Sequence, residues 1–287
     1  MILVTGAAGK TGRAVVSALS SRKRSVRESV HRADQAHLVE SAGANESIVG
    51  DMRSEKTLGQ ATRGMRAIYH ICPNVSPDEE LIGRMVIAAS RAAGVEQLVF
   101  HSVLHPQVES MPHHWKKMRV EESLFESGMP FTILQPASYM QNVLAGWKTI
   151  EERGVYAVPY SVRCRMSMVD LNDVAKAAAV VLTEPGHLGA IYELAGPEVL
   201  TQDQVAETLA RHLGRQVRAE QVPIDTWTRQ AQASGMGAYQ IETLVKMFRY
   251  YDHHGFWGNP RTLSGLLNRE PTRFDTFLQR AMRQMTS

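Results

Sequence analysis

The sequence predicts an α/β fold in which a doubly wound parallel sheet carries helices on both faces, followed by a small C-terminal α+β lobe. Three observations favour this fold. The chain opens on a short apolar run, Ile2 to Val4, that ends in a glycine-rich turn. Apolar runs of strand length then alternate with segments of helical periodicity until about residue 140. Such alternation builds right-handed βαβ units, and these units form parallel sheets.

Six short apolar runs are the predicted strands of this sheet. Several of them end at glycine, proline or asparagine, which are residues that terminate strands. The second run is the least typical, because Arg27 and Glu28 interrupt it. The six predicted strands span residues 2–4, 26–30, 47–49, 67–71, 97–103 and 131–134.

Amphipathic segments between these runs are the predicted helices. The clearest of them places Leu81, Met85, Ala88 and Ala92 at helical spacing and ends at Gly94. Each helix connects two strands and therefore covers one face of the sheet. The predicted helices span residues 14–19, 34–41, 55–63, 81–93 and 117–127.

The strict alternation breaks down in the second half of the chain. We expect a dinucleotide-binding domain over residues 1–142, and a smaller substrate-binding lobe over 143–287 that is interleaved with the main sheet and not independent. An aromatic, histidine-rich segment at 250–260 has the character of a loop. The predicted elements are strands at 166–170 and 190–194 and helices at 172–183, 201–213 and 225–247, the last broken at Gly235 and Gly237.

The composition is that of an ordinary globular protein with a sizeable core. Hydrophobic residues make up 44% of the 287 residues and charged residues 21%, which excludes disorder for most of the chain. The net charge of +3 is too small to indicate nucleic acid or a membrane surface, and no apolar run is long enough to span a membrane. The two cysteines, Cys72 and Cys164, form no disulfide framework and indicate a reducing, cytoplasmic compartment.

Three glycines follow the first strand in the pattern GxxGxxG. Gly6 permits the tight turn, Gly9 lets a pyrophosphate approach the backbone, and Gly12 lets the following helix pack closely on the strand. The N-terminus of that helix then faces the phosphates. Because the glycines lie between a strand and a helix in a chain of βαβ units, they predict dinucleotide binding.

The motifs needed for triphosphate binding, for a serine hydrolase and for metal binding are not present. Gly9-Lys10-Thr11 resembles the end of a triphosphate-binding loop, but that motif needs glycine where Val4 stands. The sequence contains no GxSxG of a hydrolase. It also contains no HExxH or other spaced set of histidines and cysteines, so we expect no metal.

The residues beyond the glycine loop favour NADP(H) over NAD(H). The carboxylate that binds the ribose 2′-hydroxyl of NAD lies about 20 residues past the loop, and here that count reaches Arg32. Arginine accommodates a 2′-phosphate, and Lys10 adds a second positive charge. Glu28 is the competing carboxylate. Asp51, with the neighbouring Met52, is the candidate partner of the adenine.

The chain contains the motifs GAAGKTG, Gly50-Asp51, HSV, VEESLFESGMPFTILQPASYMQN, MVDLNDVAKAAAVVL, YELAGPEVLT, and LNREP with Phe274. These motifs resemble the NmrA-like group of atypical short-chain dehydrogenases/reductases. The resemblance spans nearly the whole chain and implies a Rossmann fold, a small C-terminal substrate lobe and a preference for NADP(H). Members of this group include quinone, isoflavone and triphenylmethane-dye reductases, and redox sensors that bind the dinucleotide without turnover.

The resemblance implies a catalytic pattern of serine followed by Tyr-x-x-x-Lys. Lys117 matches the lysine and Ser102 matches the serine, but His113 stands where tyrosine is expected. Histidine donates protons near neutral pH, so it offers an alternative proton donor. Lys117 would bind the nicotinamide ribose and lower the pKa of that donor by its charge.

Position along the strands supplies the remaining candidate residues. The carboxyl ends of parallel strands face the cofactor crevice. Residues predicted to contact cofactor are Gly6, Ala8, Gly9, Lys10, Thr11, Gly12, Arg32, Asp51, Met52, Cys72, Pro73, Asn74, Lys117, Pro136, Ala137 and Ser138; those predicted on the substrate side are Tyr139, Asn142, Phe256 and Trp257.

The sequence therefore predicts an NADP(H)-dependent oxidoreductase that transfers a hydride to a quinone-like or other planar carbonyl compound. Two alternatives stay open: an NADP(H)-sensing regulator without turnover, and an enzyme related to sugar-nucleotide epimerases, which usually needs the tyrosine. The expected partner is a small aromatic molecule. A monomer or a homodimer is compatible with the sequence.

Overall fold

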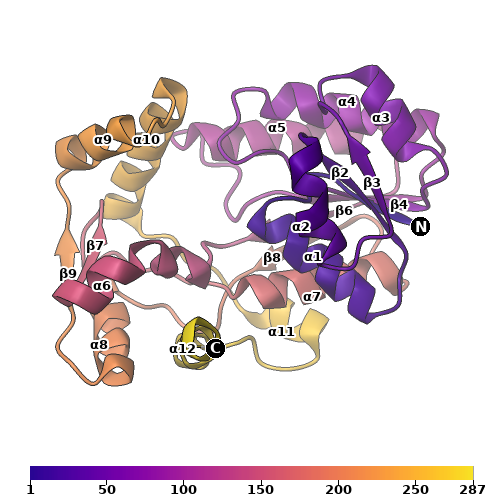
Figure 1. Cartoon of the computed structure of the whole chain (residues 1–287). Coiled ribbons are helices and arrows are strands. Elements are labelled where there is room, and N and C mark those ends of the chain that lie inside the picture. Colours follow the sequence, from indigo (N-terminus) through magenta and orange to yellow (C-terminus); the bar gives the residue numbers. More distant parts are fainter. Residues whose placement is uncertain (287) are drawn as a thin grey trace. The chain divides into compact units, whose positions relative to one another are not determined.

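The computed structural model describes residues 1–286, which form two compact units (Figure 1). Unit 1 comprises residues 1–108, 113–135 and 172–192. Unit 2 comprises residues 109–112, 136–171 and the chain from 193 onward.

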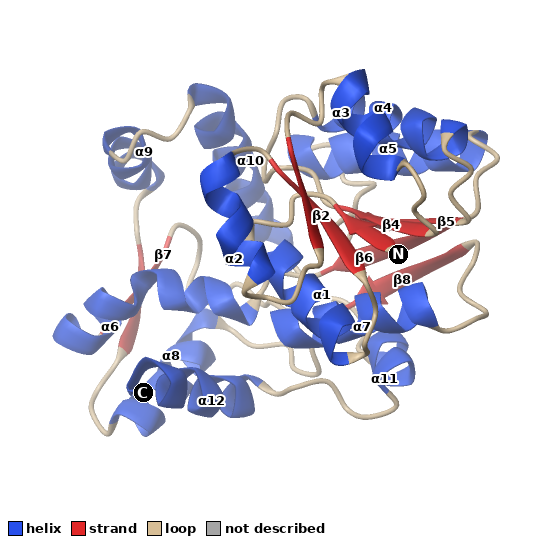
Figure 2. Ribbon diagram, turned by 45° about the vertical axis from the view of Figure 1, so that its right-hand side comes forward, coloured by secondary structure: helices blue, strands red, loops and turns tan. Residues whose placement is uncertain are grey.

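A seven-stranded sheet of order β3-β2-β1-β4-β5-β6-β8 organises unit 1 (Figure 2). The register pairs Ile2 of β1 with Val26 of β2 on one side and with Ala67 of β4 on the other, and these pairs are parallel. The predicted parallel α/β sheet is therefore confirmed. Its strands are β1 (Ile2–Val4), β2 (Val26–Val30), β3 (Glu46–Val49), β4 (Ala67–His70), β5 (Gln97–His101), β6 (Phe131–Pro136) and β8 (Ala190–Leu194).

Helices cover both faces of this sheet (Figure 2). Three helices pack on one face through a shared apolar core, and α1 and α7 lie on the other. The three are α3 (Glu55–Thr62), α4 (Glu79–Ala92) and α5 (Pro112–Glu126); the remaining helices of this part are α1 (Lys10–Ser21), η1 (Ala33–Gln35), α2 (Ala36–Glu40) and α7 (Leu171–Thr183).

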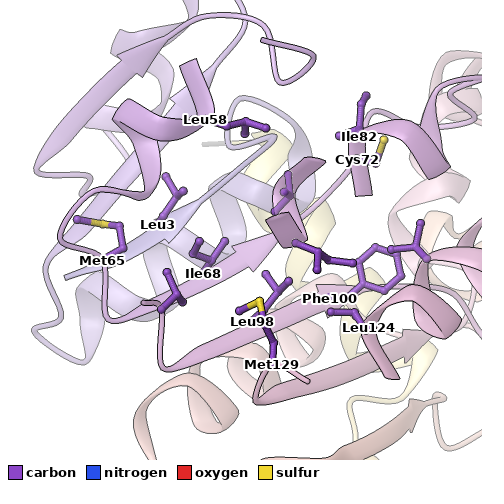
Figure 3. Packing of buried hydrophobic residues seen from close by; sticks show 14 of the residues in the cluster. Leu3, Leu58, Met65, Ile68, Cys72, Ile82, Leu98, Phe100, Leu124 and Met129 are labelled. Carbon is purple, nitrogen blue, oxygen red and sulfur yellow. The ribbon is translucent and has the colours of Figure 1, made fainter. Parts of the chain in front are cut away.

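The core between the sheet and helices α3, α4 and α5 consists of apolar side chains (Figure 3). The strands contribute alternate residues to it, because successive side chains of a strand point to opposite faces. Helical residues one turn apart meet them, as Val120 and Leu124 of α5 do. The labelled members of this core include Leu3, Ile68, Leu98, Phe100, Leu58, Ile82 and Leu124.

Unit 2 combines a two-stranded sheet with helices. Its strands β7 (Val155–Val158) and β9 (Arg218–Gln221) are parallel, pairing Val155 with Arg218. Its helices are η2 (Met140–Gly146), α6 (Trp147–Arg153), α8 (Gln202–Leu213), α9 (Ile224–Ala233), α10 (Ala238–His254), α11 (Arg261–Leu267) and α12 (Phe274–Thr286).

Some predicted element boundaries were wrong, whereas one predicted helix break is confirmed. Residues 166–170 form isolated bridges, such as Met166 with Leu200, and no regular strand. The predicted loop at 250–260 begins inside α10, which continues to His254. The predicted break at Gly235 and Gly237 is confirmed, because it separates α9 from α10. Helix α5 begins at Pro112, five residues before the predicted start, and this places His113 on the helix.

Among the residues that the structure describes, neither a membrane-spanning helix nor a cluster of metal-binding side chains is found. None of their helices is both long and apolar enough to cross a bilayer. Among residues 1–286, no group of three or more histidine, cysteine or acidic side chains is placed to hold a metal ion.

A buried carboxylate ties helix α12 to the rest of unit 2. Asp170 is fully buried, and it accepts a hydrogen bond from Arg280 at 2.7 Å and one from Gln141 Nε2 at 2.8 Å. Removing one partner of a buried ion pair leaves an uncompensated charge, whereas exposed pairs contribute little.

We expect Arg280→Met to lower the free energy of unfolding by about 2 kcal/mol, because Arg280 is itself partly exposed. Urea titration followed by circular dichroism measures this change. The control is Arg218→Met, which breaks the exposed pair with Glu220 and should cost less than about 0.5 kcal/mol. Equal effects of the two substitutions would contradict the role assigned to Asp170.

Candidate active site

The glycine loop packs so closely that two of its glycines have no room for a side chain. A Cβ on Gly6 would lie 2.7 Å from the carbonyl oxygen of Ile71, and Gly6 has a φ of +58°. A Cβ on Gly12 would lie 2.5 Å from Cα of Ala7. The loop therefore seats the start of α1 directly against β1 and the end of β4.

Gly9 is the glycine that leaves space. A Cβ there would meet only the carbonyl oxygen of Gly6, at 3.4 Å, which is ordinary contact. Gly9 is also the N-cap of α1, and it offers no side chain to the helix N-terminus. This open backbone cradle at a helix N-terminus fits the pyrophosphate of a dinucleotide. Gly6, Ala8, Gly9, Lys10, Thr11 and Gly12 would hold that group.

Arg32 lies two residues after the end of β2, at the position predicted for a 2′-phosphate, but its guanidinium is engaged. Nε and Nη2 donate to the two oxygens of Asp34, at 3.0 and 3.1 Å. The hydrogen bond from Arg32 N to Gln35 Oε1 closes the same turn. Both members of the ion pair are about two thirds exposed, at 64% and 67%. A 2′-phosphate at Arg32 would therefore compete with Asp34 for the guanidinium.

Asp51 is also bound to a neighbour. Its carboxylate accepts hydrogen bonds from the side chain of Arg53 at 2.8 Å and from the backbone N–H of Arg53 at 2.8 Å. The Arg53 guanidinium lowers the pKa of Asp51 to about 2, so this carboxylate is ionised at neutral pH. Arg53 also reaches Asp78, before α4, at 3.2 Å. Met52 packs against the apolar core.

The loop after β4 presents Pro73 and Asn74 to solvent but keeps Cys72 inside. Cys72 is buried, and burial raises the pKa of its thiol well above the usual value, with the charge of Glu79 adding to the rise. A thiol in that state is not a nucleophile at neutral pH. Pro73 and Asn74 are exposed, and their contact with the cofactor stays a prediction.

Helix α5 brings His113 and Lys117 onto one face, because they are four residues apart on a continuous helix. The Lys117 ammonium donates to Glu79 Oε1 at 2.8 Å and to the carbonyl oxygen of His101 at 3.2 Å. It also lies 5.3 Å from the ring centre of Phe100. The side chains of Lys117 and Glu79 are only 15% and 4% exposed. Lys117 is thus fixed near the carboxyl end of β5.

The histidines around this lysine are neutral at physiological pH. Burial, with the charge of Lys117 adding to it, lowers the pKa of His113 to about 4. The same two causes lower the pKa of His70 and of His101 to about 3. The lowered pKa favours the neutral imidazole of His113 at pH 7, and the proton-donor role inferred from sequence stays a prediction. Its neutral ring still offers hydrogen bonds.

Ser102 is buried in a small polar network. Its hydroxyl donates to Glu121, and Gln135 Nε2 donates to both carboxylate oxygens of Glu121 at 3.0 Å. Burial raises the pKa of Glu121. Ser102 therefore positions the end of β5 against α5 and β6, and its proton points to Glu121.

The segment after β6 belongs to unit 2. Ala137 N donates to the carbonyl oxygen of Leu194 at 3.0 Å, which aligns the end of β6 with β8. Asn142 donates to the Ser138 hydroxyl at 3.3 Å. Pro136 is buried, whereas Tyr139 is half-buried and Asn142 is exposed. The cofactor and substrate roles predicted for this segment stay predictions.

The two aromatic residues predicted on the substrate side differ in exposure. Phe256 is buried and stacks on Tyr251, with ring centres 4.9 Å apart. It is therefore a core residue of unit 2. Trp257 is 51% exposed and is accessible to a ligand.

Sequence reasoning missed Glu79, Glu121 and Arg53. Glu121 follows Lys117 by four residues, so helical spacing alone would have shown that the two share a face. Asp78-Glu79-Glu80 reads only as an acidic first turn of a helix, since the partner of Glu79 lies 38 residues away. No sequence motif points to Arg53.

A family model for the NmrA-like family matches residues 1–278. The chain belongs to this family. An NAD(P)H azoreductase of Xenophilus azovorans is 31% identical to it over 272 residues, covering 94% of this chain and 92% of the relative. Quinone oxidoreductase 2 of Escherichia coli is 27% identical over 277 residues, covering 95% of each chain.

Solved structures of two reductases share the fold. The crystal structure of an NADPH-dependent quinone oxidoreductase from Escherichia coli, complexed with NADPH, superposes with a TM-score of 0.86 at 25% identity. The match covers 98% of this chain and 100% of that one. A triphenylmethane reductase of Citrobacter sp., complexed with NADP(H), superposes with a TM-score of 0.84 at 23% identity.

Two alanine substitutions in the glycine loop should have different effects on stability and on NADPH binding. Gly9→Ala should leave thermal stability unchanged, because its methyl group has room, yet it should weaken NADPH binding about tenfold or more by filling the cradle. Gly12→Ala should destabilise the fold, because the methyl group meets backbone atoms. Differential scanning fluorimetry and a fluorescence titration with NADPH measure the two effects. Unaltered NADPH affinity in Gly9→Ala would contradict the assignment.

Proposed function

We propose that this protein is a nicotinamide-dependent reductase that transfers a hydride to a quinone-like or other planar conjugated acceptor. One observation carries the proposal: a partly buried lysine, Lys117, is held at the carboxyl end of β5, in the same unit as the glycine cradle. The relatives named as azoreductase and quinone oxidoreductase support the reaction class.

The chain's residues bind and orient, and a bound reduced nicotinamide supplies the hydride. Gly9 and the start of α1 bind the pyrophosphate. Lys117 donates a hydrogen bond toward the nicotinamide ribose or the acceptor oxygen, and its positive charge stabilises the negative charge that develops there. The neutral His113 ring, one helical turn away, orients the acceptor.

The protonation states of His113 and Ser102 decide which hydride acceptors the site suits. His113 is neutral at pH 7 and the Ser102 proton is directed to Glu121, so neither group is a ready acid. A simple ketone reduced by hydride becomes a strongly basic alkoxide that needs an acid. A quinone gives a delocalised anion that is a much weaker base. The site therefore suits quinone-like acceptors better than simple aldehydes or ketones.

The preference for NADP(H) belongs to the same proposal. Arg32 and Lys10 favour a 2′-phosphate, and Lys10 is exposed. Asp34 opposes them by binding the Arg32 guanidinium. The balance predicts a preference for NADPH with residual use of NADH. The two cysteines are free thiols, in accord with a reducing cytoplasm as the place of action.

A dinucleotide sensor without turnover is the second candidate. The neutral His113 in place of tyrosine favours it, because a site without an acid binds the cofactor as well as one with an acid. The proposed reductase and the sensor differ in a single measurable property, the oxidation of bound NADPH by an acceptor.

Coenzyme choice gives the first test. Arg32→Ala should weaken NADPH binding about tenfold and leave NADH binding within about twofold. Asp34→Asn should strengthen NADPH binding by about two- to fivefold, because the guanidinium is released. Competition by 2′,5′-ADP and by 5′-AMP isolates the contribution of the 2′-phosphate. Equal affinities of wild type and Arg32→Ala for 2′,5′-ADP would contradict the assignment of Arg32.

The pH dependence of turnover gives the second test. A pKa of about 4 leaves His113 neutral from about pH 6 to 8, so the rate of quinone reduction should stay level across that range. An imidazolium acid would instead lose about tenfold in rate for each pH unit above its pKa. Nicotinamide absorbance at saturating NADPH and quinone reports the rate. A steep alkaline fall that disappears in His113→Gln would contradict the neutral state.

A further inference from the structure

We propose that Glu79 is a positioning residue that fixes the Lys117 ammonium and leaves one of its N–H groups for the bound ligand. The inference rests on the proposed function of Lys117. Glu79 opens helix α4, whereas Lys117 lies on α5, so the pair also joins two neighbouring helices on one face of the sheet.

The hydrogen-bond geometry leaves one donor of Lys117. A lysine ammonium carries three N–H donors. One is directed to Glu79 Oε1 at 2.8 Å and one to the carbonyl oxygen of His101 at 3.2 Å. Among the residues described, no further hydrogen-bond acceptor of Lys117 is found, and the Phe100 ring covers one side at 5.3 Å. Two anchors and a ring thus define the direction of the third N–H.

Among the described residues, Glu79 is the carboxylate that forms an ion pair with Lys117, whereas the Glu121 charge only interacts with it over a longer range. The carboxylate one helical turn along α5, Glu121, accepts its hydrogen bonds from Ser102 and Gln135. The histidines at positions 70, 101, 113 and 114 all have lowered pKa values, with the charge of Lys117 among the causes. Without Glu79, the largely buried ammonium would lose its ion-pair partner and would turn toward solvent. The long, flexible side chain of lysine permits that movement.

An adjacent pair on the same two helices provides a matched comparison. Glu80 follows Glu79 on α4, and Lys116 precedes Lys117 on α5; their charged atoms lie 4.0 Å apart. The side chains of this second pair are about a quarter to a third exposed, and Lys116 donates to the carbonyl oxygen of Pro77. Glu80→Gln therefore removes the same charge, at the same helix terminus, from a solvated pair.

The experiment is a double-mutant cycle on the full chain. The variants are Glu79→Gln, Lys117→Met and both together, with Glu80→Gln as control. Each is measured for NADPH affinity by fluorescence titration and for kcat and KM with a quinone.

Glu79→Gln should lower kcat about tenfold and leave the KM for the quinone within about threefold, and Glu80→Gln should match wild type. In the Lys117→Met background, Glu79→Gln should cause no further loss, because the ammonium that Glu79 positions is gone. Losses that multiply in the double variant would overturn the proposal, since Glu79 would then act independently of Lys117. An unchanged Glu79→Gln variant would overturn it as well.

A second variant distinguishes loss of positioning from a folding defect, and a second readout distinguishes failure of this proposal from failure of the proposed function. If Glu79→Gln unfolds, Glu79→Asp keeps the charge on a shorter side chain; a kcat equal to wild type in that variant would contradict a need for exact placement of Lys117. If the wild-type protein binds NADPH but oxidises none, the proposed function fails. The same cycle read as NADPH affinity then decides the positioning role, by coupled or independent losses.

Discussion

The close approach of the glycine loop to the strand ends is the constraint on which the rest of unit 1 depends. Gly12 meets Ala7, and Gly6 meets Ile71, at separations that exclude any side chain. These contacts place the start of α1 at the carboxyl edge of the sheet, where Thr5 N also donates to the carbonyl oxygen of Tyr69. The open Gly9 cradle and the end of β4 are therefore parts of one rigid construction.

Polar side chains of α4 and α5 form a small network around the end of β5. Its charged groups are few and paired. Lys117 is balanced by Glu79, and Glu121 is satisfied by Ser102 and Gln135. The neighbouring histidines are neutral because burial and Lys117 both disfavour their charged form. The network thus presents a directed N–H from a compensated lysine, which suits binding and orientation more than strong acid catalysis.

The sequence predicts local features well and distant pairings poorly. The strands of the main sheet, the glycine loop and the spacing from His113 to Lys117 are all local patterns. The start of α5 was missed although Pro112 is a common first residue of a helix. Strand β9 is the polar run Arg-Ala-Glu-Gln, which has no strand periodicity and forms only because β7 pairs with it. The partners of Lys117 and Arg32 depend on how side chains meet after folding, so Glu79 and Asp34 had no signal in the pattern.

The central claim is that a dinucleotide held by the glycine loop delivers its hydride next to Lys117. The most direct measurement is a single-turnover experiment in which protein loaded with NADPH, or with NADPH deuterated at the transferred position, is mixed with a quinone. We expect oxidation of one equivalent of NADPH, a slower reaction with the deuterated cofactor, and a marked loss of rate in Lys117→Met. Tight binding of NADPH without oxidation, or oxidation at equal rates for the two isotopes and for Lys117→Met, would contradict this claim.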